Sequence, residues 1–543
     1  YYGNDKLYAS MNVAGLAHVV AVSGMHVAFL VGVLQSILGR NRRSSLICIC
    51  LVWLFVIMVG SPLSAIRAGI MISLLMLAPV LGRINDRATT LSFALALILI
   101  TNPFSAGSVA LQLSFGAVAG MFLFSQPIYA YFSKKFSPPR AFGAVWNYII
   151  ATLSSSLAVT VFTFPLLAVH FGYITLLAPM MNILCLWAIS FLFVGGFAVC
   201  AVGLVLSAPA SWLAAVLSCL VRYIAFVVEY AAKLPITALY MENKYAPAWL
   251  LISYALFTAY FIFRRKKKIS VLVPSALCLA MLCGVFAMTG RDMRSDTGTI
   301  SVMNVGNGQC IAVTEGESVV VIDCGSYGVT QNAGSMLSSY LRAGGRYDID
   351  YLMLTHLHSD HTTGVVRLLN LMNVNTVILP DNAEDTNGDN VLDDIIAACE
   401  DNGTNVVYIT HDTEFTAGAI RLSVYESSER GSRDESGIMS TVSVGDYDML
   451  VTGDVEKIVE RELVSSHDLS GTELLIVPHH GSKYSTSDEL LSALRPETAV
   501  ISTGYNRYGH PTKETLDKLN EYGVNVLRTD ELGRIVLHVA SGD

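Results

Sequence analysis

Long apolar runs dominate the first 290 residues of the chain. A helix that crosses a bilayer needs about 20 consecutive, mostly apolar residues, because hydrocarbon offers a bare backbone amide no partner. The pattern predicts about ten such spans, of which some are short and the seventh is long enough to be two helices. They cover 13–38, 44–60, 64–82, 88–101, 105–132, 144–170, 173–204, 210–231, 245–263 and 269–289.

The pattern changes after residue 299, where short β-branched runs broken by Gly, Asn and Asp replace the long apolar ones. Examples are SVVVID, NTVILP and LLIVPHH. Helical stretches intervene, for example over 332–343, 391–402 and 455–465. Many short strands with helices between them predict layered sheets whose outer faces are covered by helices. We therefore expect a membrane domain over 1–290 and a separate domain over 291–543.

Composition and charge support this division. Of the 543 residues, 53% are apolar and 14% are charged, whereas about 25% are charged in an average soluble domain. An ordinary soluble protein is therefore excluded. Residues 1–290 hold 18 Lys and Arg against 4 Asp and Glu, a balance of +14. Residues 291–543 hold 17 against 39, a balance of −22.

The positive charge of the first part lies in alternate connections. Basic clusters at 40–43, 83–87, 134–140 and 264–268 follow the first, third, fifth and ninth predicted spans. Short loops rich in Lys and Arg stay on the cytoplasmic side. We therefore predict a multi-pass protein of the cell membrane whose C-terminal domain lies outside. The chain opens on YYGNDKLY without a start methionine, so we also expect an N-terminal truncation of a longer protein.

Polar residues inside three predicted spans are candidates for a transport path. Such groups are costly in hydrocarbon and usually face a neighbouring helix or a watery path, so both roles stay open. An arginine whose own span holds no acidic residue costs about 3 kcal/mol unless it is paired or hydrated. The candidates are Ser23, Gly24 and His26 in GLAHVVAVSGMHV, Arg67 in GSPLSAIRAG and Asn182 in APMMNILCLW.

The chemistry of the second part is concentrated at predicted strand ends, first in the string THLHSDHTTG. His356 and His358 are two residues apart at the end of a strand, so their imidazoles point the same way. Asp360 and His361 follow at the start of a helix and can face the same cavity from the other side. A chance run of solvated histidines would not place four ligand-type residues at this spacing after an apolar strand. The string predicts two metals.

Two later strand ends complete the predicted metal site. Asp454 in LVTGD can bridge two cations with its two oxygens, which no imidazole can do. His479 and His480 in LLIVPHHGS follow the next strand, and one of them would complete a ligand shell. His356 and His358 would hold one metal, and Asp360, His361 and one of the paired histidines the other. Zinc and manganese both suit this mixture of nitrogen and oxygen ligands.

Three more residues are candidates for supporting roles. Asp323 in VVVIDCG could orient one ligating histidine from behind. His510 in GYNRYGHPT and Lys483, after the paired histidines, could steady a substrate phosphate, and His510 could donate a proton. For His510 a plain loop role stays equally open. Asp360, His510 and Lys483 are the predicted catalytic residues of a phosphodiester hydrolase.

HLHSDH followed by TGD and PHHGS resembles the metallo-β-lactamase fold, an αββα arrangement. In combination with GLAHVVAVSGMHV and SAIRAG, the whole chain resembles the competence-type DNA-uptake channel family (ComEC). The resemblance implies that 1–290 form a competence-type channel, which passes single-stranded DNA across the cytoplasmic membrane. It implies that 291–543 form an outer nuclease domain, which degrades the other strand. The family's usual N-terminal OB-fold domain is absent from this sequence.

One segment departs from the family pattern. The family's DVGQGD reads NVGNGQ here, with Asn304, Asn307 and Gln309 at positions expected to be Asp, Gln and Asp. Two carboxylates are thus missing near the predicted site. Two alternatives therefore stay open: a membrane-anchored metallohydrolase with another substrate, and a channel whose outer domain binds DNA without cutting it.

The resemblance also implies partners. These are DNA, the membrane, a DNA receptor and a cytosolic ATP-driven motor, because the chain has no GxxxxGK[ST] string of its own. A homo-oligomer is consistent with a channel but is not indicated by any motif.

Overall fold

The computed structural model describes residues 3–20, 24–39, 41–82, 86–135, 142–267, 270–295, 297–381, 390–426 and 437–540. The chain divides into two compact units, one over Lys6–Met241 and one that holds Glu242–Asp543. The last two predicted spans fall in the second unit, together with the strand-rich part of the chain. The predicted domain boundary near residue 290 stays a prediction.

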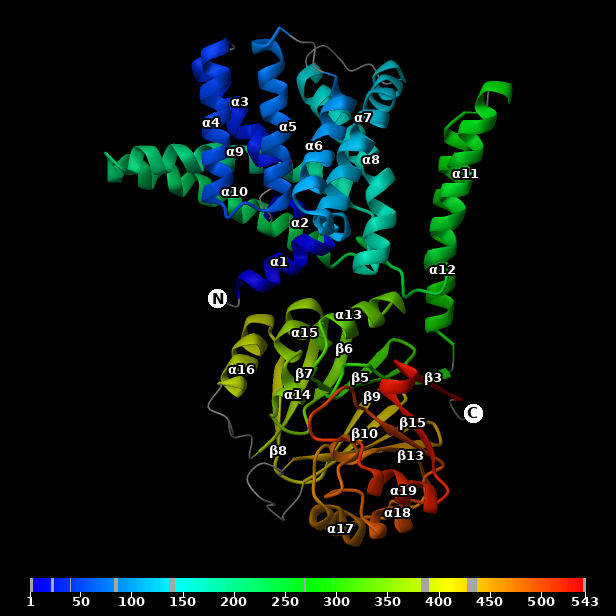
Figure 1. The fold of residues 1–543 in the computed structure, drawn as a ribbon. Coiled ribbons are helices and arrows are strands. Elements are labelled where there is room, and N and C mark those ends of the chain that lie inside the picture. The colour runs from blue at the N-terminus through cyan, green and yellow to red at the C-terminus, as the bar shows by residue number, and fades with distance from the viewer. Residues whose placement is uncertain are drawn as a thin grey trace. The chain divides into compact units, whose positions relative to one another are not determined.

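The first unit is helical. Helices α3 to α8 run roughly along one direction, and α9 and α10 cross them (Figure 1). A two-stranded ribbon of β1 (Tyr173–Thr175) and β2 (Ala238–Tyr240) joins two of the connections. The helices are α1 (Gly3–Val13), α2 (Ala17–Val20), α3 (Gly24–Leu38), α4 (Arg42–Met58), α5 (Leu63–Val80), α6 (Arg87–Thr101), α7 (Val109–Lys135), α8 (Gly143–Phe171), α9 (Ala178–Gly203) and α10 (Ser207–Ala232).

The first predicted span, 13–38, starts too early, because α1 ends at Val13 and the next helix, α2, begins only at Ala17. The chain turns at Gly15, which has a φ of +81°, a conformation that glycine adopts without steric cost. A Cβ at this position would lie 2.5 Å from the Cβ of Ala178, so the close approach of α9 also requires glycine. The long prediction over 173–204, by contrast, forms one helix, α9, after the short strand β1.

Six helices in the described part of the chain are long and apolar enough to cross a membrane. They are α7, α8, α9, α10, α11 (Ala246–Lys267) and α12 (Leu272–Met293). Helices α3, α5 and α6 are apolar but shorter. The prediction of a multi-pass membrane protein is confirmed. The count of about ten spans stays a prediction.

The second unit contains two seven-stranded sheets. The first has the order β16-β3-β4-β5-β6-β7-β8 and the second β15-β14-β13-β12-β11-β10-β9. Neighbouring strands are parallel to one another from β5 through β8 in the first sheet and from β12 through β15 in the second. The strands are β3 (Thr297–Val302), β4 (Cys310–Glu315), β5 (Ser318–Cys324), β6 (Asp348–Met353), β7 (Asn373–Pro380), β8 (Asn405–Ile409), β9 (Thr413–Ala417), β10 (Ile420–Tyr425), β11 (Met439–Val444), β12 (Tyr447–Val451), β13 (Thr472–Ile476), β14 (Thr498–Ile501), β15 (Asn525–Arg528) and β16 (Ile535–Ala540).

Helices cover the outer face of each sheet (Figure 1). Because successive side chains of a strand point to opposite faces, Val320 and Ile322 of β5 join the core between the sheets. Val319 and Val321 of the same strand join the core beneath the helices. This confirms the predicted αββα architecture. The covering helices are α13 (Ala333–Ala343), α15 (Val365–Leu371) and α16 (Val391–Asn402) on one side, and α17 (Lys457–Ser466), α18 (Asp488–Leu494) and α19 (Lys513–Glu521) on the other.

Asn243, which precedes α11, connects Thr289 of helix α12 with the end of helix α13 through two hydrogen bonds. The Asn243 side chain donates to Thr289 Oγ1 at 2.7 Å and to the Ala343 carbonyl, at the end of α13, at 2.8 Å. Asn243 is buried, so both bonds are shielded from water. These contacts fix the sheets to the preceding apolar helix pair.

Candidate metal centre

Candidate ligands follow three strands of the two sheets. The loop after β6 leads into the short helix α14 (Ser359–Thr362), while β12 and β13 of the other sheet end in turns. Because parallel strands present their carboxyl ends at one edge, these loops converge where the two sheets meet. They carry His356, His358, Asp360 and His361 after β6, Asp454 after β12, and His479 and His480 after β13.

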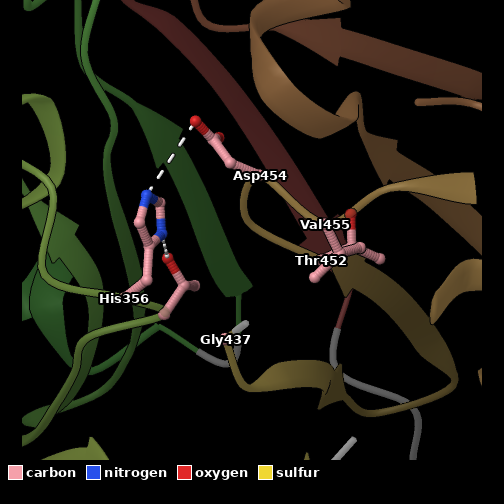
Figure 2. A pocket seen from close by; sticks show the side chains of 6 residues that line it. His356, Gly437, Thr452, Asp454 and Val455 are labelled. Atoms are coloured by element: carbon pink, nitrogen blue, oxygen red, sulfur yellow. Dashed lines mark hydrogen bonds and ion pairs between the residues drawn. The ribbon is translucent and has the colours of Figure 1, made fainter. Parts of the chain in front are cut away.

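The candidate ligands form two groups, in each of which the ligand atoms lie within 4.8 Å of one another. One group holds Asp360, His361, Asp454 and His480, and the other holds His356, His358 and Asp454. Asp454 belongs to both groups. Its two oxygens face different neighbours: Oδ1 lies 3.3 Å from His361 Nε2, and Oδ2 lies 3.9 Å from His356 Nε2. Figure 2 shows His356 and Asp454 pointing toward one another across the pocket.

Buried polar atoms without hydrogen-bond partners meet at this point. They are His356 Nε2, His361 Nε2, His480 Nε2 and Asp454 Oδ1. An unsatisfied buried polar atom costs about 1–3 kcal/mol, so four of them together need a ligand to stabilise them. Imidazole nitrogens and carboxylate oxygens are the donors that Zn²⁺ and Mn²⁺ accept. The residues therefore fit two divalent cations.

Asp323 holds His361 in place. Its carboxylate is fully buried and lies 2.8 Å from His361 Nδ1. It also accepts from the backbone N–H and the hydroxyl of Thr355, both at 2.8 Å, and from Gln309 Nε2 at 2.9 Å. With its Nδ1–H donated to Asp323, His361 presents the lone pair of Nε2 to the cluster. The predicted orienting role of Asp323 agrees with this geometry. Thr355 was not predicted, although it directly precedes the histidine motif.

The backbone at the paired histidines determines which of them enters the cluster. Both have left-handed φ values, 51° for His479 and 53° for His480, which is uncommon outside glycine and clusters at functional sites. His480 Nδ1 donates to the Ser502 carbonyl at 2.8 Å, so its Nε2 faces the cluster, 3.5 Å from Asp360 Oδ2. His479 Nε2 lies 3.8 Å from Asp454 Oδ2 and is the more exposed of the two side chains. The sequence left this choice open, and the structure groups His480 with the other ligands.

The shifted pKa values of the clustered histidines are those expected of a site that binds cations. Burial, followed by the charge of His361, lowers the pKa of His356 to about 3, so this imidazole is neutral and able to ligate. Burial opposes the charged form of His361, but Asp454 and Asp323 raise its pKa well above the ordinary value. The pKa of His480 is raised in the same sense, by Asp454 and Asp360 against burial. Bound cations would therefore replace protons that His361 and His480 otherwise hold between carboxylates.

Of the two other predicted catalytic residues, His510 lies beside His479, whereas Lys483 follows the paired histidines in the chain. The ring of His510 lies 5.6 Å from that of His479, and burial followed by the charge of His479 lowers its pKa, which favours the neutral imidazole. Lys483 is exposed, and its Nζ lies 5.0 Å from the centre of the Tyr484 ring.

The NVGNGQ segment forms one wall of the site. A Cβ at Gly308 would lie 2.7 Å from the Asp360 carbonyl oxygen, and the Gln309 N–H donates to that oxygen at 3.1 Å. NVGNGQ therefore retains both glycines of the family's DVGQGD pattern, where the backbone packs closely, but neither of its two aspartates. Gln309 donates its amide to Asp323, a bond that an ionised aspartate could not make. The Asn307 side chain is buried, and its Oδ1 has no hydrogen-bond partner.

The predicted transport residues lie in the first unit, except that Ser23 falls outside the described residues. Arg67 is 6% exposed, and its Nε and Nη1 have no hydrogen-bond partner. Its Nη2 would lie 3.3 Å from a Cβ at Gly24, so the structure brings these two positions together. His26 packs on Phe193, with ring centres 5.2 Å apart. Asn182 Nδ2 donates to a serine of α8, Ser156, at 2.9 Å, while Asn182 Oδ1 is buried without a partner.

Comparison with known proteins covers both parts of the chain. The model of the competence protein family matches residues 3–268, and the model of the metallo-beta-lactamase superfamily matches residues 303–423. ComE operon protein 3 of Bacillus subtilis (strain 168) is 24% identical over 559 residues, which are 98% of this chain and 69% of that protein.

Two further relatives show similar coverage. Competence protein ComA of Neisseria gonorrhoeae is 24% identical over 99% of this chain and 72% of its own length. The uncharacterized protein YcaI of Escherichia coli (strain K12) is 22% identical over 98% of this chain and 68% of its own length. The two family models match in the same order as the two motif sets of the sequence. The chain is therefore a multi-pass membrane protein with a competence protein domain over residues 3–268, followed by a metal-dependent hydrolase domain of the metallo-β-lactamase superfamily.

Proposed function

We propose that this protein passes one strand of DNA across the cytoplasmic membrane during natural transformation and hydrolyses the other strand at the metal centre. Its competence protein domain and its similarity to two competence proteins over nearly its whole length support a role in DNA uptake. The hydrolase part rests on one observation above all: Asp454 is shared by two groups of potential ligands, and four buried nitrogen and oxygen atoms of these groups have no hydrogen-bond partner.

The chain's own residues would divide the work at this centre. His356 and His358 would hold one metal, and Asp360, His361 and His480 the other, with Asp454 between them. Asp323 and the Ser502 carbonyl keep His361 and His480 in the tautomers that ligate. Two bound divalent metals would supply a hydroxide nucleophile and offset the charge that develops on the phosphate.

His510 and Lys483 are suited to hold the substrate. His510 is half-buried beside His479, and its neutral ring keeps an N–H with which to donate a hydrogen bond to a phosphate oxygen. Lys483 brings an exposed positive charge three residues after His480. Both residues would bind and orient the substrate phosphate, while the bound metals would promote its hydrolysis.

In the membrane part, Arg67 is the strongest candidate for contact with the transported strand. A buried guanidinium with unpaired nitrogens is unstable in hydrocarbon unless an anion or water reaches it. A phosphodiester backbone would supply that anion, and arginine binds phosphate oxygens through several N–H groups at once. Gly24, close beside Arg67, leaves room for such a contact. We further propose that the metal centre lies outside the cell, where a receptor delivers DNA, and that a cytosolic motor draws the strand inward.

The enzymatic half of this proposal is tested with the full chain in lipid nanodiscs. After removal of metal with a chelator, addition of Zn²⁺ or Mn²⁺ should restore hydrolysis of end-labelled DNA, because the ligand groups are inactive without cations. Metal-loaded protein that leaves DNA intact but hydrolyses a phospholipid or a cell-wall polymer would favour an anchored hydrolase instead. Metal-loaded protein that binds DNA without cutting it would favour a binding domain.

A further inference from the structure

Exposed tyrosines gather on the loops that border the metal centre. Nine large apolar side chains are exposed in the described residues of 297–540, and five of them lie on three of these loops. Isolated exposed apolar residues are ordinary on a protein surface, whereas a concentration of them marks a binding site. The five are Tyr327 at 55%, Val329 at 41%, Tyr484 at 61%, Tyr505 at 89% and Tyr508 at 71% exposure.

Backbone contacts place two of these loops side by side. Gly306 forms a β-bridge with Tyr327, and the Asn307 N–H donates to the Tyr327 carbonyl at 3.0 Å. A Cβ at Gly328 would lie 3.4 Å from the Tyr505 carbonyl oxygen. Residues 327–329 and 504–508 are therefore neighbours in space, although about 180 residues separate them in the sequence.

Ring contacts connect these loops to the metal ligands. The ring of Tyr508 lies 6.0 Å from that of His510 at an interplanar angle of 31°. His510 in turn lies 5.6 Å from His479, whose neighbour His480 belongs to the ligand group. Tyr484 follows the same turn, with Lys483 Nζ over its ring at 5.0 Å. The tyrosines thus border the place where a scissile phosphate would be held.

The charge of this part of the chain indicates what the tyrosines bind. Residues 291–543 carry 39 acidic against 17 basic residues, so a general attraction for the phosphate backbone, on which most DNA-binding surfaces rely, is unavailable here. Stacking on aromatic rings engages bases instead, and it does not depend on net charge or on sequence. Arg507 and Lys483, both exposed on these loops, add local positive charge.

We propose that Tyr327, Tyr484, Tyr505 and Tyr508 form a stacking surface that holds the bases of an unpaired DNA strand beside the metal centre. This inference rests on the proposed nuclease function and specifies its substrate. Bases that are paired within a duplex have no free face to offer, so the surface selects a single strand after the duplex has been opened. The tyrosines act on binding and orientation, and the metal ligands on bond cleavage.

The test uses the full chain in nanodiscs with metal, and two single-stranded oligonucleotides of equal length. One carries thymine bases, and the other carries a stable abasic sugar at every position. The measured quantity is the ratio of kcat/KM between them, for the wild type, Tyr505→Ala/Tyr508→Ala and Tyr505→Phe/Tyr508→Phe. Tyr408→Ala is the matched control, because Tyr408 is an exposed tyrosine at 44% on β8, outside the three loops.

We expect the wild type to prefer the base-bearing strand by about tenfold or more for each stacked base. The double Ala variant should lose most of this preference, while the double Phe and Tyr408→Ala variants should keep it. A double Ala variant with an undiminished preference, or a wild type that cleaves both strands equally well, would overturn the stacking surface and leave the nuclease intact. A wild type that cleaves neither strand would contradict both proposals.

Discussion

Replacing Asp454 with Ala should reduce metal-dependent DNA hydrolysis by the full chain by about 1000-fold or more. Asp454 contributes to both ligand groups, so its loss removes the bridge and leaves the histidines on either side without a shared anion. Metals stabilise the transition state of such reactions by several kcal/mol, and each 1.4 kcal/mol corresponds to tenfold in rate. The measurement is the initial rate on end-labelled DNA, together with the metal content of the purified protein.

Asp446→Ala is the matched control for this variant. Asp446 lies in the exposed turn between β11 and β12. Its replacement therefore removes a carboxylate next to the same strand without changing the metal site. It should retain the rate and the metal content of the wild type. If the Asp454→Ala protein hydrolysed DNA as fast as the Asp446→Ala protein, the two-metal assignment would be wrong.

Replacing Arg67 with Ala should reduce DNA uptake by cells by about tenfold or more. The substitution removes the buried guanidinium that would contact the phosphates of the passing strand. Arg67→Lys should restore part of the uptake, because it keeps the charge but loses the forked hydrogen-bonding geometry. Uptake is measured as nuclease-resistant label inside cells that carry the full-length gene.

Arg222→Ala is the matched control for Arg67. Arg222 is an exposed arginine on α10, so its removal changes the charge of a membrane helix by the same amount without emptying a buried site. Equal protein levels in the membrane, measured by immunoblot, separate a transport defect from a folding defect. Normal uptake by Arg67→Ala cells would show that Arg67 serves only the packing of α5.

The αββα fold could be predicted because its rules are local. The sequence SVVVID of β5 shows a continuous apolar run and no alternation of apolar and polar residues. Such a run is typical of a strand that is buried on both faces. Helices between such runs then predict covering layers. TEFTA and MSTVSV, the sequences of β9 and β11, hold too many polar residues to stand out as strands. In the structure Ser440 and Thr441 of β11 are nevertheless buried.

The metal cluster could be predicted because strand ends of one sheet edge meet in space, and ligand-type residues stood at several of them. What remained open depended on backbone conformation. His479 and His480 are chemically identical, and only their left-handed turn and the Ser502 carbonyl decide which ring enters the cluster. The role of Gln309 was equally hidden, because its partner Asp323 lies on a neighbouring strand.

The start of the first predicted span shows the limit of hydropathy in the membrane part. Residues 13–38 are apolar almost throughout, so a window average sees one helix. The turn at Gly15 has a left-handed φ, and α9 approaches so closely there that a side chain would collide with Ala178. Such a contact joins segments about 160 residues apart, and no local pattern records it.

Whether one protein transports one strand of DNA and degrades the other can be measured by following the two strands separately during uptake. Cells that carry the full-length gene receive duplex DNA whose two strands bear different labels. We predict that one label enters as a long strand resistant to external nuclease, while the other appears in the medium as short fragments. Entry of both labels together, or release of both as fragments with none inside, would contradict the account.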